Sequence, residues 1–335
     1  MGILCWITWN YFKNGVLLMA NDPNKILINE AHEWIDDFTD DKGSDGAVYE
    51  WNAQRVKDFK STSIETLLYD DYFLGLKDTI FDGVAQDIID LFSERKKREV
   101  NMAIFLEAIG SGKTFKASII QWLLWFELSM HENPQLFYNL TPNSVIALMM
   151  MSRTETQAKR ITFGDVWLRF QSPFNKDYFP VNSRYTNEIR ISRNNTCVYA
   201  GTSSSLSILG YNVYSATIDE ANFLEVIDDS KKSMGEIYDA AEEMHNAVMN
   251  RMTSRFMKDG KIPGLLTMIS SPRYPESFLE RRVRQCKAEG VENLNMFWRS
   301  RSLWEAKGEK FFPSKRFFTV DTKSLKIVKE ADDVG

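Results

Sequence analysis

The chain has 335 residues, of which 44% are hydrophobic and 13% aromatic, and its formal net charge at pH 7 is −5. This composition is typical of a globular protein, and the length suits either two domains or one α/β domain with an N-terminal extension. No apolar run is long enough for a transmembrane helix, and the negative charge argues against a protein that coats DNA with its whole surface. A local strip that faces DNA is still compatible with this charge.

The cysteines and histidines show no pattern of a disulfide framework or a metal site. The cysteines are far apart and form no C-x-x-C pair, so we expect reduced, structural thiols at Cys5, Cys197 and Cys286. The histidines make no H-E-x-x-H motif: they are His32, His131 and His245. The apolar stretch 1–20 lacks the order of a signal peptide, which favours a cytoplasmic location, and either Met1 or Met19 could be the natural start.

Residues 1–95 are expected to form a helical lead-in that belongs to the following domain or packs on it. Helical patterns run around 50–59 and 82–92. Gln86 in the second pattern could bind adenine, because an amide can pair with both the donor and the acceptor of the base edge. The basic cluster 95–98 follows, and we interpret it as a solvated helix end rather than as a contact to DNA or a partner.

A phosphate loop is predicted where the apolar run Met102–Leu106 meets a helical pattern that continues to about His131. Gly110 and Gly112 between them allow positive φ angles and a close approach of the backbone to a ligand. N–H groups at a helix start favour an anion, so we expect the loop to bind the phosphates of ATP. Its residues are Glu107, Ala108, Ile109, Gly110, Ser111, Gly112, Lys113 and Thr114.

Two side chains of this loop have specific predicted roles. Lys113 can reach the β- and γ-phosphates and act in catalysis there, and the Thr114 hydroxyl can bind Mg²⁺. Glu107 departs from the motif G-x-x-x-x-G-K-[ST], because it stands where the first glycine belongs. The alternative interpretation is an ordinary glycine turn that caps a helix.

Three further elements are predicted before the next motif. The continuous apolar run Ser144–Met151 indicates a strand buried on both faces of a parallel sheet. A helix that reaches Phe170 should follow, with Ser152 or Thr154 as its N-cap. Two short alternating runs then predict a β-hairpin, with strands at 188–192 and 196–200.

The second motif is Tyr214–Ala221, a β-prone run that ends in two acids. We expect a strand beside the one that precedes the phosphate loop, so that Asp219 can bind Mg²⁺. Glu220 is then the predicted catalytic carboxylate, which orients or deprotonates the water that attacks the γ-phosphate. An isolated Asp-Glu pair would indicate only a solvated turn, and the order of the two motifs is what favours an ATPase.

Beyond the acidic motif, a helical pattern over 237–256 and an apolar strand over 265–269 are predicted. Ser270 and Ser271 end this strand next to the acidic motif, where their hydroxyls could sense the γ-phosphate and couple its loss to the following segment. The next helix presents a basic face, a candidate DNA contact made by Arg281, Arg282 and Arg284.

The alternation of strands and helices predicts an α/β fold: a P-loop NTPase of the ASCE (additional strand, catalytic glutamate) type. Its mostly parallel central sheet is flanked by helices and preceded by a helical N-terminal extension. The expected boundaries are 96–320 for the ATPase domain and 321–335 for a C-terminal tail or the start of a linker.

Between about Asn101 and Leu279 the chain resembles the large terminase subunit of tailed phages, the ATPase motor that packages DNA into the prohead. The resemblance rests on four motifs, at residues 110–114, 151–159, 218–221 and 269–272. It implies ATP and Mg²⁺ as cofactors, and double-stranded DNA, a portal protein and a small terminase subunit as partners. It also implies a homo-oligomeric ring, or a monomer in isolation, in the cytoplasm of an infected bacterial host and not in the mature virion or a membrane.

Two features differ from this family. Many relatives carry an arginine inside the phosphate loop or just before the glycine upstream of the acidic strand, where this chain has Ile109 and Leu209. An arginine finger must then come from elsewhere, although surface salt bridges are the alternative role of the candidates: Arg153, Arg160, Arg251 and Arg255. The family also usually carries a C-terminal nuclease domain, and too few residues follow Ser302 for one, so we expect no nuclease activity from this chain.

The sequence therefore predicts ATP hydrolysis that drives the translocation of double-stranded viral DNA into a prohead. Two alternatives stay open. A helicase-like ATPase that remodels DNA shares the order of the motifs, and strand separation on a forked duplex would identify it. The other alternative is a nucleotide-gated scaffold that binds ATP but hydrolyses little of it, which the departure from the motif at Glu107 keeps open.

Overall fold

The computed structural model describes residues 48–154, 158, 163–181, 188–202, 210–227, 238–291, 293–308, 311, 317–321 and 326–331. Several sequence-based expectations lie outside these residues. They concern positions 1–47 of the lead-in, with Met19, Cys5 and His32, and also Arg160 and Leu209.

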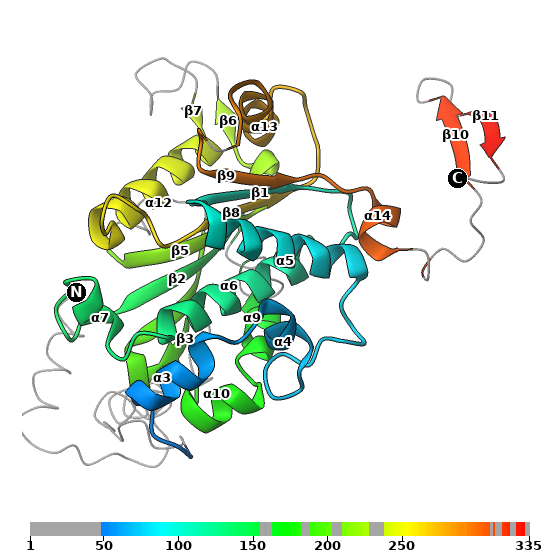
Figure 1. Cartoon of the computed structure of the whole chain (residues 1–335). Helices are drawn as coiled ribbons and strands as arrows, with labels where there is room; N and C mark the ends of the chain where they lie inside the picture. Colours follow the sequence, from blue (N-terminus) through cyan, green and yellow to red (C-terminus); the bar gives the residue numbers. More distant parts are fainter. Residues whose placement is uncertain are drawn as a thin grey trace, which may run out of the picture. The chain divides into compact units, whose positions relative to one another are not determined.

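A seven-stranded sheet forms the centre of the fold, in the order β3-β4-β2-β5-β8-β1-β9 (Figure 1). All neighbours in it are parallel except the pair β3 and β4. This antiparallel pair confirms the predicted hairpin, and the seven buried residues of β2 confirm the predicted internal strand. The strands are β1 (Met102–Leu106), β2 (Ile146–Ser152), β3 (Glu188–Ile191), β4 (Thr196–Thr202), β5 (Asn212–Asp219), β8 (Leu266–Ser270) and β9 (Met296–Arg299).

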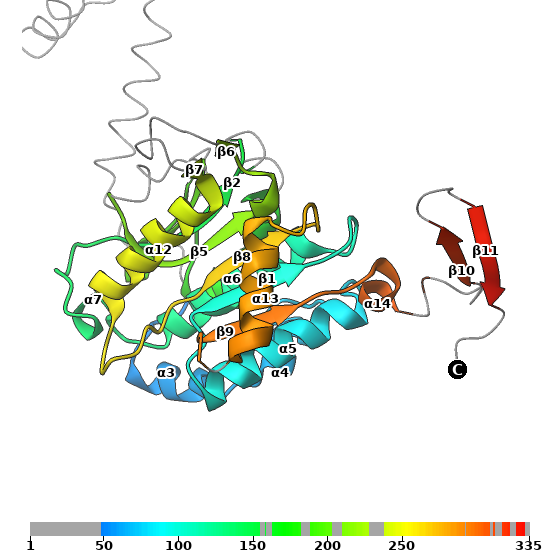
Figure 2. The ribbon, with the colours of Figure 1, turned by 90° about the horizontal axis from the view of Figure 1, so that it is seen from above.

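Helices cover both faces of this sheet, and β1 shows how its side chains divide between them. Ala103 and Phe105 belong to the hydrophobic core on the side of α6 (Lys113–Ser129). Met102, Ile104 and Leu106 point the other way, into the core formed with α12 (Ala240–Phe256) and α13 (Phe278–Glu289). Figure 2 shows these two helices in front of the sheet. The predicted fold class, a mostly parallel sheet between helical layers, is thereby confirmed.

The face that α6 covers also carries the helices of the N-terminal extension. Leu68, Ile88 and Leu91 are buried in the same core as the tryptophans of α6. The predicted helical patterns are confirmed with one addition, the short α4. The helices on this face are α3 (Ala53–Lys60), α4 (Ile64–Tyr69), α5 (Asp82–Lys97), α9 (Phe163–Arg169) and α10 (Pro173–Tyr178).

The basic cluster at the end of α5 is only partly the solvated helix end that we expected. Lys96 and Lys97 are exposed. Arg95 instead donates to the carbonyl oxygen of Pro263 over 2.9 Å, and Arg98 donates to that of Met296 over 2.8 Å. The two arginines therefore tie the helix end to the segments that enter β8 and β9.

Other elements differ from the sequence-based expectations. Ser152 is the last residue of β2, and the carbonyl oxygen of Thr154 accepts a hydrogen bond of 3.0 Å from the N–H of Ala158. Asp239 caps α12, which begins three residues later than predicted. The residues interpreted as a tail include β11 (Lys326–Ala331), which pairs antiparallel with β10 (Phe317–Asp321). The remaining short elements are α7 (Pro134–Phe137), β6 (Val226–Ile227), β7 (Tyr238–Asp239) and α14 (Leu303–Lys307).

Among the helices in the described part of the chain, none is long and apolar enough to cross a membrane.

His131, just after α6, is expected to make the protein less stable in acid. Its ring stacks on Phe137 with the centroids 3.8 Å apart. Burial, assisted by the positive charges of Lys60 and Lys258, lowers the pKa of His131 from 6.5 to about 4. Between these pH values the unfolded chain binds more protons than the folded chain. This contribution to the free energy of unfolding is therefore present above pH 6.5 and is lost as the pH falls towards 4.

Denaturant unfolding at a series of pH values across this interval measures the effect. The variant His131→Gln should lose less of its free energy of unfolding on acidification than the wild type, because its side chain takes up no proton. Equal slopes in the two proteins would show that His131 does not contribute.

Candidate functional site

The predicted phosphate loop joins the end of β1 to the start of α6. Gly110 has a φ angle of 81° and Gly112 one of 91°, both in the left-handed region that favours glycine. Gly112 is also the N-cap of α6, so the unpaired N–H groups of this helix lie at the loop, as an anion site requires. A β carbon at Gly112 would lie 3.4 Å from Cγ2 of Val84 in α5. The loop therefore has the backbone conformation that its sequence predicts.

The ammonium group of Lys113 links the loop to the end of β8. It donates to the carbonyl oxygen of Ala108 over 3.0 Å and to Oγ of Ser271 over 3.0 Å. Burial lowers the pKa of Lys113, and the negative charges of Glu220, Glu107 and Asp219 oppose that shift. The lysine is therefore close enough to the acids of the second motif to interact with their charges.

The two acids lie at the end of β5. Asp219 is the last residue of the strand and is buried. Glu220 follows with a φ angle of 53°, a left-handed conformation that is unfavourable for any residue but glycine. Its carboxylate accepts a weak hydrogen bond of 3.5 Å from Oγ of Ser270. A strained backbone next to a buried carboxylate is a feature found at functional sites.

We expected the strand of the acidic motif to lie beside β1. The structure instead places β8 between β5 and β1. β8 pairs with both strands, and Gly264 at its entry permits a close approach to β5. A β carbon on Gly264 would lie 1.8 Å from the carbonyl oxygen of Tyr214. The additional strand belongs to the predicted fold class, and it keeps both motifs at the same edge of the sheet because all three strands are parallel.

Ser270 and Ser271 lie at the end of β8, next to the acidic motif as predicted, and a residue that the sequence analysis missed connects them to α13. This residue is Asn222, whose backbone N–H donates to Oγ of Ser270 over 3.2 Å. Its side-chain amide donates to the carbonyl oxygen of Ser271 and to Oε1 of Glu280. The only sequence signal for Asn222 is its place two residues after Glu220.

The departure at Glu107 is explained by a group of buried charges behind the loop. Glu107 forms an ion pair with Lys116 of α6, and Lys116 also pairs with Asp87 of α5 over 2.5 Å. Asp87 in turn accepts from the guanidinium of Arg301, which follows β9, over 2.8 Å. The sequence analysis missed Asp87, Lys116 and Arg301, because their spacing along the chain gives no sign that they meet.

The donor atoms at this edge of the sheet fit a magnesium ion bound together with phosphates. Thr114, on the first turn of α6, and Asp219 offer a hydroxyl and a carboxylate, which are hard oxygen ligands. Within the described residues no group of three His, Cys, Asp or Glu side chains could hold a metal ion by itself. Phosphate oxygens and water would therefore have to complete the coordination, which is how Mg²⁺ is commonly bound.

The arginine-finger candidates are not gathered at the loop. Arg153 is exposed and follows β2 at the edge where the two motifs lie. Arg251 and Arg255 occupy the last two turns of α12, which connects two parallel strands and therefore runs back toward the opposite edge. In a single chain these two arginines lie away from Lys113.

The remaining candidates already have partners within the chain. The side chain of Gln86 is exposed and donates to Asp90 over 2.8 Å. The three arginines of α13 are bound to Asp239 (Arg281), Gln285 (Arg282) and Glu276 (Arg284) at 2.9, 3.0 and 3.1 Å. Their roles toward adenine and DNA stay predictions.

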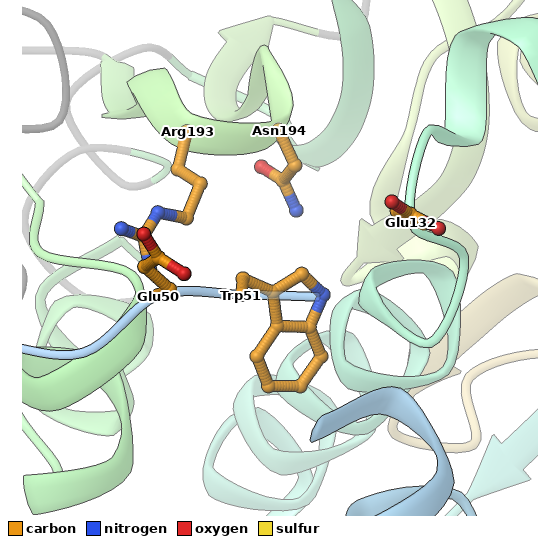
Figure 3. A pocket seen from close by; sticks show the side chains of 5 residues that line it. All are labelled: Glu50, Trp51, Glu132, Arg193 and Asn194. Carbon is orange, nitrogen blue, oxygen red and sulfur yellow. The ribbon is translucent and has the colours of Figure 1, made fainter. Parts of the chain in front are cut away.

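A separate pocket of about 220 Å³ lies next to the start of β4 (Figure 3). Figure 3 shows Asn194 on one side and Trp51 opposite it, with Arg193 and Glu50 at one end and Glu132 at the other. Arg193 donates to the carbonyl oxygens of Tyr49 and Tyr178, so it holds the pocket wall together. None of the predicted site residues lines this pocket.

A glycine turn at a helix start, a buried lysine and two acids at one edge of a parallel sheet define a P-loop NTPase domain. A family model described as "Uncharacterized protein MJ0330, N-terminal P-loop domain" matches residues 45–318. The chain belongs to this family. No curated protein matches the sequence.

Large terminases, the family that the motifs resemble, are among the solved structures similar to this chain. The HK97 bacteriophage large terminase is 13% identical with a TM-score of 0.47, over 74% of this chain and 43% of that one. A large terminase from a thermophilic bacteriophage is 12% identical with a TM-score of 0.40, over 62% and 41%. The large terminase ATPase domain of Thermus phage P74-26 is 13% identical with a TM-score of 0.39, over 64% and 80%.

This chain thus spans less than half the length of the first two of these terminases. Similarity at this level does not bear on activity.

Proposed function

We propose that the domain hydrolyses ATP and uses the hydrolysis to translocate double-stranded DNA, as a packaging motor does. The observation that carries the proposal is the position of the Lys113 ammonium, which contacts the phosphate loop and Ser271 and interacts with the charges of Asp219 and Glu220. The proximity of these residues at one edge of the sheet supports a role in phosphoryl transfer.

Each group then has one task. The N–H groups of the loop and the first turn of α6 bind the phosphates, and Lys113 neutralises the charge that develops on the transferred phosphoryl group. Thr114 and Asp219 would hold Mg²⁺, which would supply further positive charge to the phosphate oxygens. Glu220 orients the attacking water and takes up its proton.

Ser270 and Ser271 are proposed to couple this chemistry to movement. Ser271 contacts Lys113, and Asn222 connects both serines to Glu280 of α13. Loss of the γ-phosphate would alter the contacts of Lys113 and so shift this connected group. The basic face of α13 is a candidate to move DNA, with Arg281, Arg282 and Arg284.

The assembly that this function requires is also a proposal. A finger from Arg153, Arg160, Arg251 or Arg255 would act on the nucleotide of a neighbouring subunit in a homo-oligomeric ring. A portal protein and a small terminase subunit are the further partners, in the cytoplasm of an infected bacterial host and outside the mature virion.

The test is the steady-state rate of phosphate release from ATP and Mg²⁺, measured against protein concentration with and without duplex DNA. A finger supplied by a second subunit predicts a rate that rises faster than linearly with concentration, and a motor predicts a higher rate with DNA. Separation of a forked duplex would favour the helicase-like remodeller. Tight ATP binding with negligible hydrolysis, even with DNA present, would favour the nucleotide-gated scaffold.

A further inference from the structure

Glu107 occupies the first position of the phosphate loop and turns its side chain away from solvent. The residue is fully buried. One carboxylate oxygen accepts a hydrogen bond of 2.9 Å from Oγ of Ser111, and the other pairs with Lys116. The carboxylate therefore bridges the turn of the loop and the helix that follows it.

Ser111 is the residue of the turn that Glu107 contacts. It stands between Gly110 and Gly112, the two residues whose backbones are free to adopt many conformations. Ser111 is itself fully buried, and its N–H donates to the carbonyl oxygen of Ala108 over 3.3 Å. Because the glycines on either side restrict the backbone little, the hydrogen bond from the Ser111 hydroxyl to Glu107 restrains the conformation of the turn.

The charge of Glu107 is balanced by a connected set of residues. Lys116 binds both Glu107 and Asp87, and Asp87 binds Arg301. The carbonyl oxygen of Arg301 accepts a hydrogen bond of 3.1 Å from the N–H of Ala108, so Arg301 also contacts the loop directly. Lys116 and Arg301 thus balance the two carboxylates, with Arg299 as a further cation 3.8 Å from Asp87, and a buried carboxylate needs such compensation.

We propose that Glu107 is a positioning residue of the phosphate loop, which acts through Ser111 to hold the turn in the conformation that binds phosphate. A carboxylate in this position would ordinarily repel an anion, and Lys116 removes that penalty. The inference rests on the proposed function, because it assumes that the loop binds a nucleotide.

The experiment measures the dissociation constants of ATP and ADP, with Mg²⁺, for the full chain by calorimetry. The variants are Ser111→Ala, Glu107→Gln and the double variant. Each single change should weaken nucleotide binding by about 10-fold, the usual effect of losing a hydrogen bond to a charged group. Because both residues act through one contact, the double variant should bind no more weakly than the weaker single variant.

Ser111→Thr, which keeps the hydroxyl, should restore most of the affinity. The matched control is Arg95→Met, which removes a mostly buried cation that pairs with Glu127 at 3.1 Å and lies on α5 away from the loop. This control should lower thermal stability without changing the dissociation constants. A loss of affinity that merely follows loss of stability would appear in the control as well, and would overturn the inference.

Unchanged affinity in both single variants, or effects that add fully in the double variant, would also overturn it. Should Glu107→Gln fail to fold, the result for Ser111→Ala is sufficient, because that variant leaves every charge of the connected set in place. A wild-type chain that binds no nucleotide would overturn the proposed function together with the inference. Wild-type binding with unaltered variants would overturn the inference alone.

Discussion

Replacing Glu220 by glutamine is expected to lower the rate of ATP hydrolysis by on the order of 100-fold or more. Glutamine keeps the size of the side chain but cannot take up the proton of the attacking water. Lys113 and the glycines of the loop are unchanged, so ATP should bind as tightly as before. The combination of intact binding and lost turnover distinguishes a catalytic carboxylate from a residue that binds the substrate.

Steady-state turnover and ATP affinity, measured on the same preparations, test this expectation. The matched control is Glu243→Gln, an exposed acid on α12, which should hydrolyse like the wild type. Hydrolysis at the wild-type rate by Glu220→Gln would remove Glu220 from the mechanism and favour the scaffold alternative.

The backbone of Glu220 offers a second readout. Its φ angle of 53° suits glycine better than any other residue. Glu220→Gly should therefore be at least as stable as the wild type although it hydrolyses as slowly as Glu220→Gln. A catalytic role for this carboxylate would explain why a glutamate occupies a backbone conformation that is unfavourable for it.

The parts of the site that follow one another along the chain could be predicted from the sequence. The loop from Glu107 to Thr114 has a strand before it and a helix after it, so its conformation depends on local rules for glycine and helix ends. The buried strands β2 and β8 were recognisable for a similar reason, because a strand covered on both faces is a continuous apolar run.

Relations between distant segments could not be predicted in this way. Asp87, Lys116 and Arg301 look like ordinary charged residues of three separate segments, and only the packing of α5, α6 and the end of β9 brings them together. The position of β8 between β1 and β5 likewise depends on pairing in the sheet, for which a single strand sequence carries no signal. The sequence therefore shows Glu107 as a departure from the motif, but not the pairing with Lys116 and Asp87 that accommodates it.

Replacing Lys116 by methionine is expected to lower the free energy of unfolding by about 3–5 kcal/mol, the usual cost of breaking a buried ion pair. Lys116 is fully buried between Glu107 and Asp87, which are fully buried as well. Methionine fills a similar volume but leaves Glu107 without its ion-pair partner, while Asp87 keeps Arg301 and, at 3.8 Å, Arg299. An uncompensated buried charge, rather than a cavity, is then the source of the loss.

Two further variants test whether the uncompensated buried charge is the cause of the lost stability. Lys97→Met removes an exposed lysine that pairs with Glu94 at 3.2 Å, and it should cost under about 1 kcal/mol because solvent already screens that pair. The double variant Lys116→Met with Glu107→Gln removes one charge of each sign, so it should be more stable than Lys116→Met alone. Denaturant unfolding of the four proteins measures these differences. Equal small losses in Lys116→Met and Lys97→Met would mean that water reaches the carboxylates behind the loop, and Glu107 would then lack the rigid support on which its positioning of Ser111 depends.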